Sequence, residues 1–176
     1  MTKKALVYGL IAGVIISTLM VISMANCPKD MEGGTGMMII GFSTMFIAFS
    51  MMFVAVRSYR NKEGGGYITI GKAFSLGAVI AFIASTMYVI TWMIYSHFFF
   101  PDFADKYAVA MLAKAQAAHL NAAKMAAKVK EMDDFKIMYR NPVMVVLMTY
   151  MEILPLGLVI ALVCALIYKK KAPVVQ

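Results

Sequence analysis

Residues 143–168 decide the fold: they read VMVVLMTYMEILPLGLVIALVCALIY, and nearly all of them are apolar. An α-helix crosses the roughly 30 Å of bilayer hydrocarbon with about 20 mostly apolar residues, so this run is long enough to span a membrane. Earlier runs of the same character lie at about residues 5–25, 37–56 and 73–100. The sequence therefore predicts an all-α membrane protein with four transmembrane helices.

The composition agrees with this class of protein. The chain has 176 residues, of which 62% are hydrophobic and 15% charged, and its mean hydropathy is +0.77. Soluble domains are roughly 45–50% apolar and about 25% charged. We therefore expect one integral membrane domain over residues 1–176, in direct contact with the lipid bilayer, and no separate soluble domain.

The net charge of +8 is concentrated beside the ends of the spans. The cations that flank one side are Lys3, Lys4, Arg57, Arg60, Lys62, Lys72, Lys169, Lys170 and Lys171. The short loop on the other side, residues 26–36, has Lys29 against Asp30 and Glu32. Cytoplasmic loops of membrane proteins are enriched in Lys and Arg, so both termini and the loop 57–72 are predicted to be cytoplasmic. Topology explains the basic charge, and we expect no nucleic-acid partner.

The segment between the third and fourth runs, residues 101–141, is rich in Ala, Lys and Met. We expect it to be helical and to cap the bundle outside the cytoplasm. Asn121 is its weakest helical position, so one long helix and a helical hairpin are both open. Apolar residues recur from Met111 to Met132 at steps of four and three. The segment is therefore a solvated cap, a helix lying in the outer leaflet, or a surface that binds a partner.

Glu152 is the one acidic residue inside any of the four runs. A charged side chain at mid-span costs about 2.5–3.5 kcal/mol on insertion scales, unless it is protonated or partnered. Helix rise places Glu152 about nine residues, or about 13 Å, below the outer end of its span. Hydroxyl groups at similar depth are candidates for a polar layer that hydrogen-bonds this carboxyl group. They belong to Ser17, Thr44, Tyr88, Thr91 and Thr149.

Pro155 follows Glu152 by one helical turn and removes a backbone donor, which adds a kink and a free carbonyl oxygen. A carboxyl group beside a kinked helix is typical of a proton or cation pathway, and equally of a protonated structural node. Glu152, Thr149 and Pro155 with the hydroxyl layer are therefore the candidate site. Its structural, transport and ligand-binding interpretations are all open.

Small residues recur one turn apart within the spans. Gly9 and Gly13 form such a ladder in the first run, Gly77 lies in the third and Gly157 in the fourth. Small residues let helix backbones approach closely. These glycines are predicted helix-packing positions, either within the chain or between two copies of it.

The first and third runs also share a pattern. Lys4 and Gly9 correspond in order and spacing to Lys72 and Gly77. Both runs are predicted to cross the membrane in the same direction, so duplication of a two-helix hairpin is one explanation. Chance similarity between apolar helices is the other.

The sequence contains no nucleophile elbow, no paired acids at glycosidase spacing and no histidine–glutamate metal helix. His97 and His119 lack the spaced partners of a zinc site. The 18 methionines leave copper binding open, although flexible methionine also fills apolar cores. We predict a non-enzymatic protein without a metal or a cofactor.

Five blocks are spread over nearly the whole chain: Lys3–Gly13 (KKALVYGLIAG), Arg57–Arg60 (RSYR), Gly71–Trp92, Pro101–Phe103 (PDF) and Tyr139–Leu158. Together they resemble an uncharacterised family of small bacterial inner-membrane proteins, catalogued only as a domain of unknown function. The part from Thr149 to Gly157, with Glu152 and Pro155, is the most specific. The resemblance implies a four-span protein of the bacterial inner membrane, and it implies neither an activity nor a catalytic residue.

Two functions follow as hypotheses. The leading one is a non-enzymatic scaffold or accessory subunit that forms a homo-oligomer or docks with other membrane proteins through residues 101–141. The alternative is a small proton- or cation-coupled transporter or channel in which Glu152 titrates.

Overall fold

The computed structural model describes residues 2–26 and 35–170. Within these residues the helices are α1 (Thr2–Ala25), α2 (Thr35–Phe49), α3 (Met51–Lys62), α4 (Ile70–Phe98), α5 (Phe103–Ala117), α6 (Ala122–Tyr139) and α7 (Pro142–Tyr168). Four stretches are long and apolar enough to cross a membrane: Thr2–Ala25, Ile39–Lys62, Ile70–Phe98 and Pro142–Tyr168. The predicted all-α membrane fold is confirmed. Of the predicted short loop 26–36, residues 27–34 lie outside the described part.

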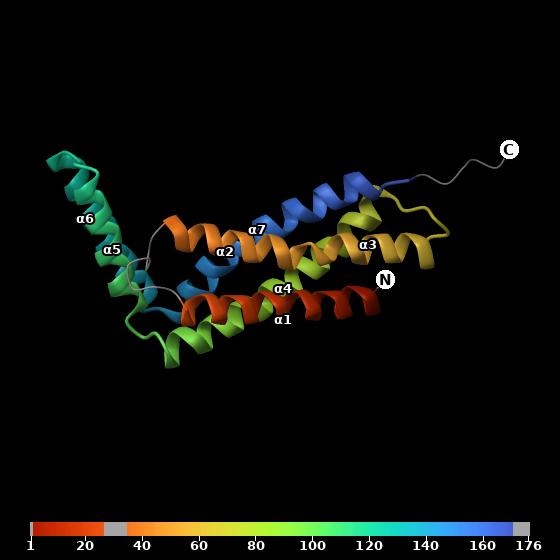
Figure 1. The fold of residues 1–176 in the computed structure, drawn as a ribbon, viewed down its shortest axis with the longest axis horizontal. Coiled ribbons are helices and arrows are strands. Elements are labelled where there is room, and N and C mark those ends of the chain that lie inside the picture. Colours follow the sequence, from red (N-terminus) through yellow and green to blue (C-terminus); the bar gives the residue numbers. More distant parts are fainter. Residues whose placement is uncertain (1, 27–34, 171–176) are drawn as a thin grey trace.

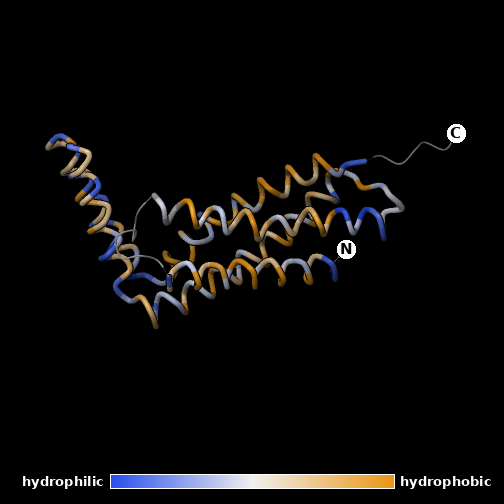
Figure 2. Tube along the Cα trace, in the orientation of Figure 1, coloured by the Kyte–Doolittle hydropathy of each residue, from blue (hydrophilic) through white to orange (hydrophobic). Residues whose placement is uncertain are grey.

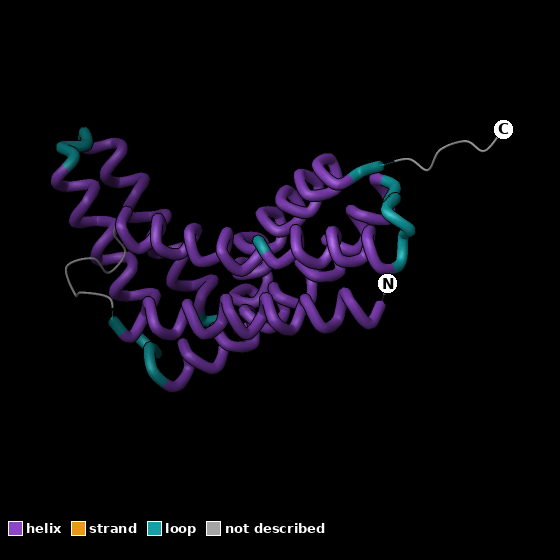
Figure 3. Tube along the Cα trace, turned by 45° about the vertical axis from the view of Figure 1, so that its right-hand side comes forward, coloured by secondary structure: helices purple, strands orange, loops and turns teal. Residues whose placement is uncertain are grey.

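The spanning helices lie side by side in an elongated bundle (Figure 1), and α5 and α6 form a hairpin that leans away from one end of it (Figure 3). At the other end α1 begins, α7 ends and the α3–α4 loop turns; we call this the terminal end and the opposite one the hairpin end. Hydrophobic residues dominate the middle of the bundle, while hydrophilic residues gather at the terminal end and along the hairpin (Figure 2). The bundle is therefore the membrane domain. That the hairpin lies outside the cytoplasm stays a prediction.

The second span consists of two helices because the chain is irregular at Ser50. The Ser50 hydroxyl donates to the carbonyl oxygen of Ile47 at 2.6 Å. The backbone N–H of Phe53 donates to the Ser50 carbonyl oxygen at 3.0 Å, a tighter turn than that of an α-helix. A serine that bonds back to its own helix bends it. Helices α2 and α3 therefore form one span with a break in the middle.

All four predicted packing glycines lie where helices of this chain meet. A Cβ at Gly9 would lie 2.9 Å from the Ile83 Cβ, and one at Gly13 would lie 3.0 Å from the Met87 Cβ, both on α4. A Cβ at Gly77 of α4 would meet Ala161 of α7. A Cβ at Gly157 of α7 would meet Ala81 of α4 and Phe49 of α2. Helix α4 thus packs closely between α1 and α7. The duplication hypothesis is not decided by this packing.

The segment 101–141 is a hairpin rather than one long helix. Its turn contains His119 with φ +51°, a left-handed conformation that ends α5. The Asn121 side chain then accepts a hydrogen bond from the backbone N–H of Lys124 at 2.9 Å and caps the start of α6. Because the chain reverses, Ala115 of α5 and Met132 of α6 are buried. The apolar stripe predicted along one helix is divided between the two.

Candidate functional site

Glu152 lies on the exposed side of α7. The next residue, Ile153, is completely buried, and Thr149 one turn earlier is also buried. Successive residues of an α-helix are rotated by about 100° around its axis. Because Thr149 and Ile153 pack against the bundle, Glu152 lies toward the exposed side of α7. The Glu152 carboxyl group makes no hydrogen bond or ion pair with any described residue. Helix α7 thus presents a carboxyl group on the outside of the bundle at mid-span.

The hydroxyl groups predicted to surround Glu152 bond elsewhere. Thr149 donates to the Val145 carbonyl oxygen at 2.8 Å. Thr44 donates to the Gly41 carbonyl oxygen at 2.7 Å. These bonds satisfy the hydroxyl groups within their own helices. The structure therefore differs from a layer in which hydroxyl groups hydrogen-bond Glu152.

Ser17 and Thr91 come together across helices. Their hydroxyl oxygens are 3.1 Å apart and join α1 to α4. The Thr91 hydroxyl also lies 2.8 Å from the carbonyl oxygen of Met87. This pair is a link between helices of the bundle, away from the exposed flank of α7.

Tyr88 is half-buried on α4 and faces a small cavity of about 60 Å³ at the side of the bundle. The other lining residues are Met20, Ser23 and Met24 of α1 and Ile40, Gly41 and Thr44 of α2. One water needs roughly 10–15 Å³ of such space, so the cavity has room for a few waters. Of the predicted residues, Tyr88 and Thr44 therefore share a cavity, and Glu152 is not among the residues that line it.

An aromatic cluster joins the bundle to the hairpin, and we call it the aromatic junction. The Trp92 Nε1–H donates to the Tyr139 hydroxyl at 2.7 Å. The Phe103 ring lies 4.9 Å from the Trp92 ring and 5.3 Å from the Tyr139 ring, between centroids. Burial raises the pKa of Tyr139, and the negative charge of Glu152 acts in the same direction, while the bond from Trp92 opposes them. The junction thus connects α4 of the bundle, through Trp92, with α5 and α6 of the hairpin.

Sequence reasoning missed the bond between Tyr150 and Thr86. The Tyr150 hydroxyl donates to Thr86 Oγ1 at 2.8 Å and connects α7 with α4. The Tyr150 ring also stacks on Phe82 with centroids 6.3 Å apart. A tyrosine inside an apolar run needs a hydrogen-bond partner, which was the available signal. The identity of the partner depends on packing.

Pro155 is exposed within α7, and its missing N–H leaves the Met151 carbonyl oxygen without its usual helical donor. In residues 2–26 and 35–170, no group of three or more His, Cys, Asp or Glu side chains is placed to hold a metal ion. What this site offers chemically is thus one carboxyl group and one carbonyl oxygen that lacks its usual helical donor, both on a spanning helix.

The fold and this site define a multi-pass, all-α membrane protein with a carboxyl group exposed at mid-span. A family model described as "Protein of unknown function (DUF4199)" matches residues 7–170. The chain belongs to this family, which confirms its resemblance to a family of unknown function. No curated protein and no solved structure matches the chain.

Proposed function

We propose that this protein is a non-enzymatic docking component of a bacterial inner membrane. Helix α7 binds a helix of a second copy, or of another membrane protein, around Glu152. The observation that supports this most strongly is the exposure of the Glu152 carboxyl group in the middle of a spanning helix.

Energetics favour a partner over lipid at this position. A charged side chain that faces hydrocarbon costs about 2.5–3.5 kcal/mol on insertion scales. Interhelical hydrogen bonds in membranes are worth up to about 1–2 kcal/mol. A neighbouring helix that offers a donor to Glu152 therefore removes part of this cost, whereas lipid chains offer none.

The surroundings of Glu152 fit a helix-sized contact. Glu152, Pro155 and Val159 are all exposed and recur at the spacing of one helix face, with half-buried Met148 one turn before them. We call these four residues the Glu152 face. The open carbonyl of Met151 beside Pro155 adds an acceptor for a donor on the partner.

The hairpin offers a second contact for the same partner. Val109 of α5 and Ile137 of α6 are each 65% exposed, so the hairpin presents apolar side chains that a neighbouring protein can contact. The hairpin also leans away from the bundle (Figure 1), so its surface is open to a neighbour. This supports docking through residues 101–141 in addition to α7.

The distribution of cations supports the orientation. Arg57, Lys62, Lys72 and Lys169 all belong to the terminal end, beside the ends of the spans. By the positive-inside rule this end is cytoplasmic, with both termini. The hairpin then lies on the opposite side of the membrane.

The test compares two substitutions of Glu152 in the full-length protein purified in mild detergent. Glu152→Leu removes all hydrogen bonding, and we expect it to weaken association about tenfold, as the loss of roughly 1–2 kcal/mol implies. Glu152→Gln keeps hydrogen-bonding groups of the same size, and we expect most of the association to remain. Light scattering with mass spectrometry of co-purified chains measures the complex.

Ile90→Ala is the matched control, because Ile90 is also an exposed residue of a spanning helix but belongs to α4. It should leave the complex unchanged. A wild-type protein that stays monomeric and brings down no membrane protein contradicts the proposal. So does a Glu152→Leu variant that assembles as well as the wild type.

Transport is the second candidate, and the cavity at Tyr88 favours it. The cavity has room for a few waters, and the hydroxyl-bearing residues Tyr88 and Thr44 line it. Glu152→Gln separates the two functions because glutamine can hydrogen-bond but cannot carry a proton. If the wild type conducts protons in liposomes and Glu152→Gln keeps the complex but loses this flux, transport is favoured. If the wild type forms the complex but conducts no protons, docking is favoured.

A further inference from the structure

A groove at the terminal end lies far from the Glu152 face, and we call it the α3 groove. Its volume is about 320 Å³. Three successive turns of α3 line it: Phe53 and Val54, then Arg57 and Ser58, then Asn61 and Lys62, with Tyr168 of α7 as the facing wall. None of these described lining residues is acidic.

The α3 groove changes from apolar to basic along its length. Val54 is 50% exposed and belongs to the membrane-spanning part of α3. Lys62 is the last residue of that helix, and at 1.5 Å per residue it lies about 12 Å further along. The groove thus begins at the level of lipid chains and ends at the level of head groups. Its shape and polarity fit an amphiphilic ligand.

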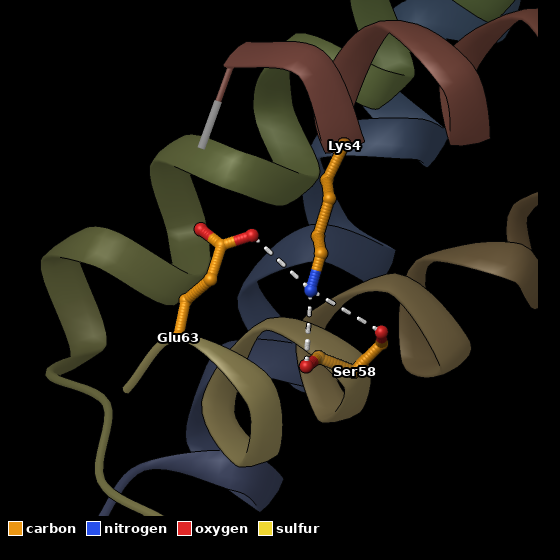
Figure 4. Close-up of polar contacts among 3 residues, drawn as sticks. All are labelled: Lys4, Ser58 and Glu63. Atoms are coloured by element: carbon orange, nitrogen blue, oxygen red, sulfur yellow. Dashed lines mark hydrogen bonds and ion pairs between the residues drawn. The ribbon is translucent and has the colours of Figure 1, made fainter. Parts of the chain in front are cut away.

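The cations of the groove are available for an anion. Arg57 and Lys62 are exposed and form no ion pair with any described residue. The nearby acid, Glu63, is engaged by Lys4, whose Nζ lies 3.2 Å from Glu63 Oε1 and 3.2 Å from the Ser58 carbonyl oxygen (Figure 4). Lys4 therefore compensates the local negative charge, and positive charge prevails in the groove.

The wall opposite α3 is held in place. The edge of the Tyr168 ring meets Phe53, with centroids 6.3 Å apart and planes at 64°. The Arg60 guanidinium lies 5.3 Å from the centre of the same ring. Tyrosine rings are common at the membrane–water boundary, where the ring is in an apolar environment and its hydroxyl group meets water. The groove is preformed rather than a gap between loose side chains.

We propose that the α3 groove binds a phosphate-bearing anionic lipid, with its phosphate at Arg57 and Lys62 and an acyl chain along Val54 and Phe53. Arginine pairs with phosphate through two parallel hydrogen bonds, and basic pockets between spanning helices suit anionic head groups. The apolar half of the groove favours a lipid over free phosphate. This inference is independent of docking at Glu152, because the groove lies at the terminal end of the bundle and Glu152 lies at mid-span.

Native mass spectrometry of the full-length protein in neutral detergent tests the site. Phosphatidylglycerol and phosphatidylcholine with identical acyl chains are titrated separately. We expect the wild type to bind phosphatidylglycerol more tightly. The double variant Arg57→Gln/Lys62→Gln should weaken that binding about 30-fold, since each cation near an anionic head group contributes about fivefold.

Lys72→Gln/Lys169→Gln is the matched control, because it removes the same charge at the same end but outside the groove. It should change binding by less than about twofold. An equal loss in both double variants overturns the site, because it indicates general attraction to a basic surface. Equal binding of the two lipids overturns it as well.

Competition with inorganic phosphate distinguishes a site for a lipid phosphate from a site for free phosphate. Excess phosphate, with chloride at matched ionic strength as reference, should not displace bound phosphatidylglycerol. Full displacement by phosphate alone assigns the site to a free anion and overturns the lipid proposal. Unchanged melting temperatures of both double variants verify that folding is intact.

Discussion

Lys4 belongs to the first turn of α1, but its side chain reaches the end of α3. Its ammonium group contacts both the Glu63 carboxylate and the Ser58 carbonyl oxygen, as Figure 4 shows. The hydrogen bond from Lys4 is the main cause of a lowered pKa of Glu63. One cation thus joins the start of the first span to the end of the second.

This contact predicts a pH dependence of stability. Because the folded-state pKa of Glu63 is lowered, its contribution is present above the ordinary value of 4.5 and is lost as the pH falls through the folded-state pKa. We expect the melting temperature in detergent to fall as the pH is lowered below 4.5, and to fall less in Glu63→Gln.

Glu131→Gln is the control for that titration. Glu131 is also an exposed acid paired with a lysine, Lys128 at 2.8 Å, but within the hairpin. We expect it to keep the wild-type pH profile. Identical profiles for Glu63→Gln and the wild type contradict the role of the Lys4–Glu63 pair.

The depth of Glu152 was predictable from the sequence, but its direction was not. Depth follows from counting residues along α7 at a constant rise. Direction depends on which side of α7 packs against α4, and a helix that is apolar all round carries no such signal. The position of Gly157 against Ala81 orients α7, and Glu152 follows from it.

At the scale of elements, close contacts at small residues set the distances between helices. Gly77 is the example at which a neighbouring backbone is involved: a Cβ there would lie 2.7 Å from the Ala161 Cβ and 3.1 Å from the Ala161 Cα. The backbone of α7 cannot move away without disturbing its other contacts with α4. Even one methyl group at Gly77 is therefore too large.

We predict that Gly77→Ala destabilises the bundle by about 1–3 kcal/mol through overpacking. Gly71→Ala is the matched control, because Gly71 lies in the first turn of the same helix and a Cβ there meets nothing within 4 Å. It should be neutral or slightly stabilising, since alanine favours helix. Reversible denaturant unfolding in micelles measures both, and equal effects contradict the packing argument.

The reversal of the 101–141 segment was only partly predictable. Asn121 indicated a weak position, and as the cap of α6 it explains where the second helix begins. The turn itself is made by His119 at a positive φ, where glycine is the usual residue. Without glycine or proline there, the sequence could not distinguish a hairpin from one long helix.

At the scale of the whole molecule, the aromatic junction connects the bundle with the hairpin. Trp92 and Tyr139 are 47 positions apart in the sequence, yet their polar atoms are 2.7 Å apart. The pairing of Trp92 with Tyr139 depends on how the chain returns from the hairpin to the bundle. Contacts of this kind follow from tertiary packing and not from local pattern.

The junction predicts a measurable effect of one hydroxyl group. Tyr139→Phe leaves the buried Trp92 N–H without its acceptor, which should cost about 1–3 kcal/mol. Trp92 is the only tryptophan in the chain, so its fluorescence reports on this site directly. We expect a changed emission maximum and a lower melting temperature.

Tyr107→Phe serves as the comparison. Tyr107 packs against Phe103 and Phe135 in the same junction, but its hydroxyl makes no hydrogen bond with any described residue. Its emission and melting temperature should match the wild type. If both variants behave alike, the Trp92–Tyr139 bond does not hold the junction together.

The oblique setting of the hairpin has a consequence for crowding in the bilayer. Helix α5 has 15 residues, so at 1.5 Å per residue the hairpin extends about 22 Å from its base. Since the hairpin leans sideways (Figure 3), its tip extends beyond the outline of the helix bundle. A neighbouring membrane protein can therefore approach the bundle closely at the terminal end. At the hairpin end it meets the tip of the hairpin first, so the hairpin sets a minimum distance between the two bundles on that side.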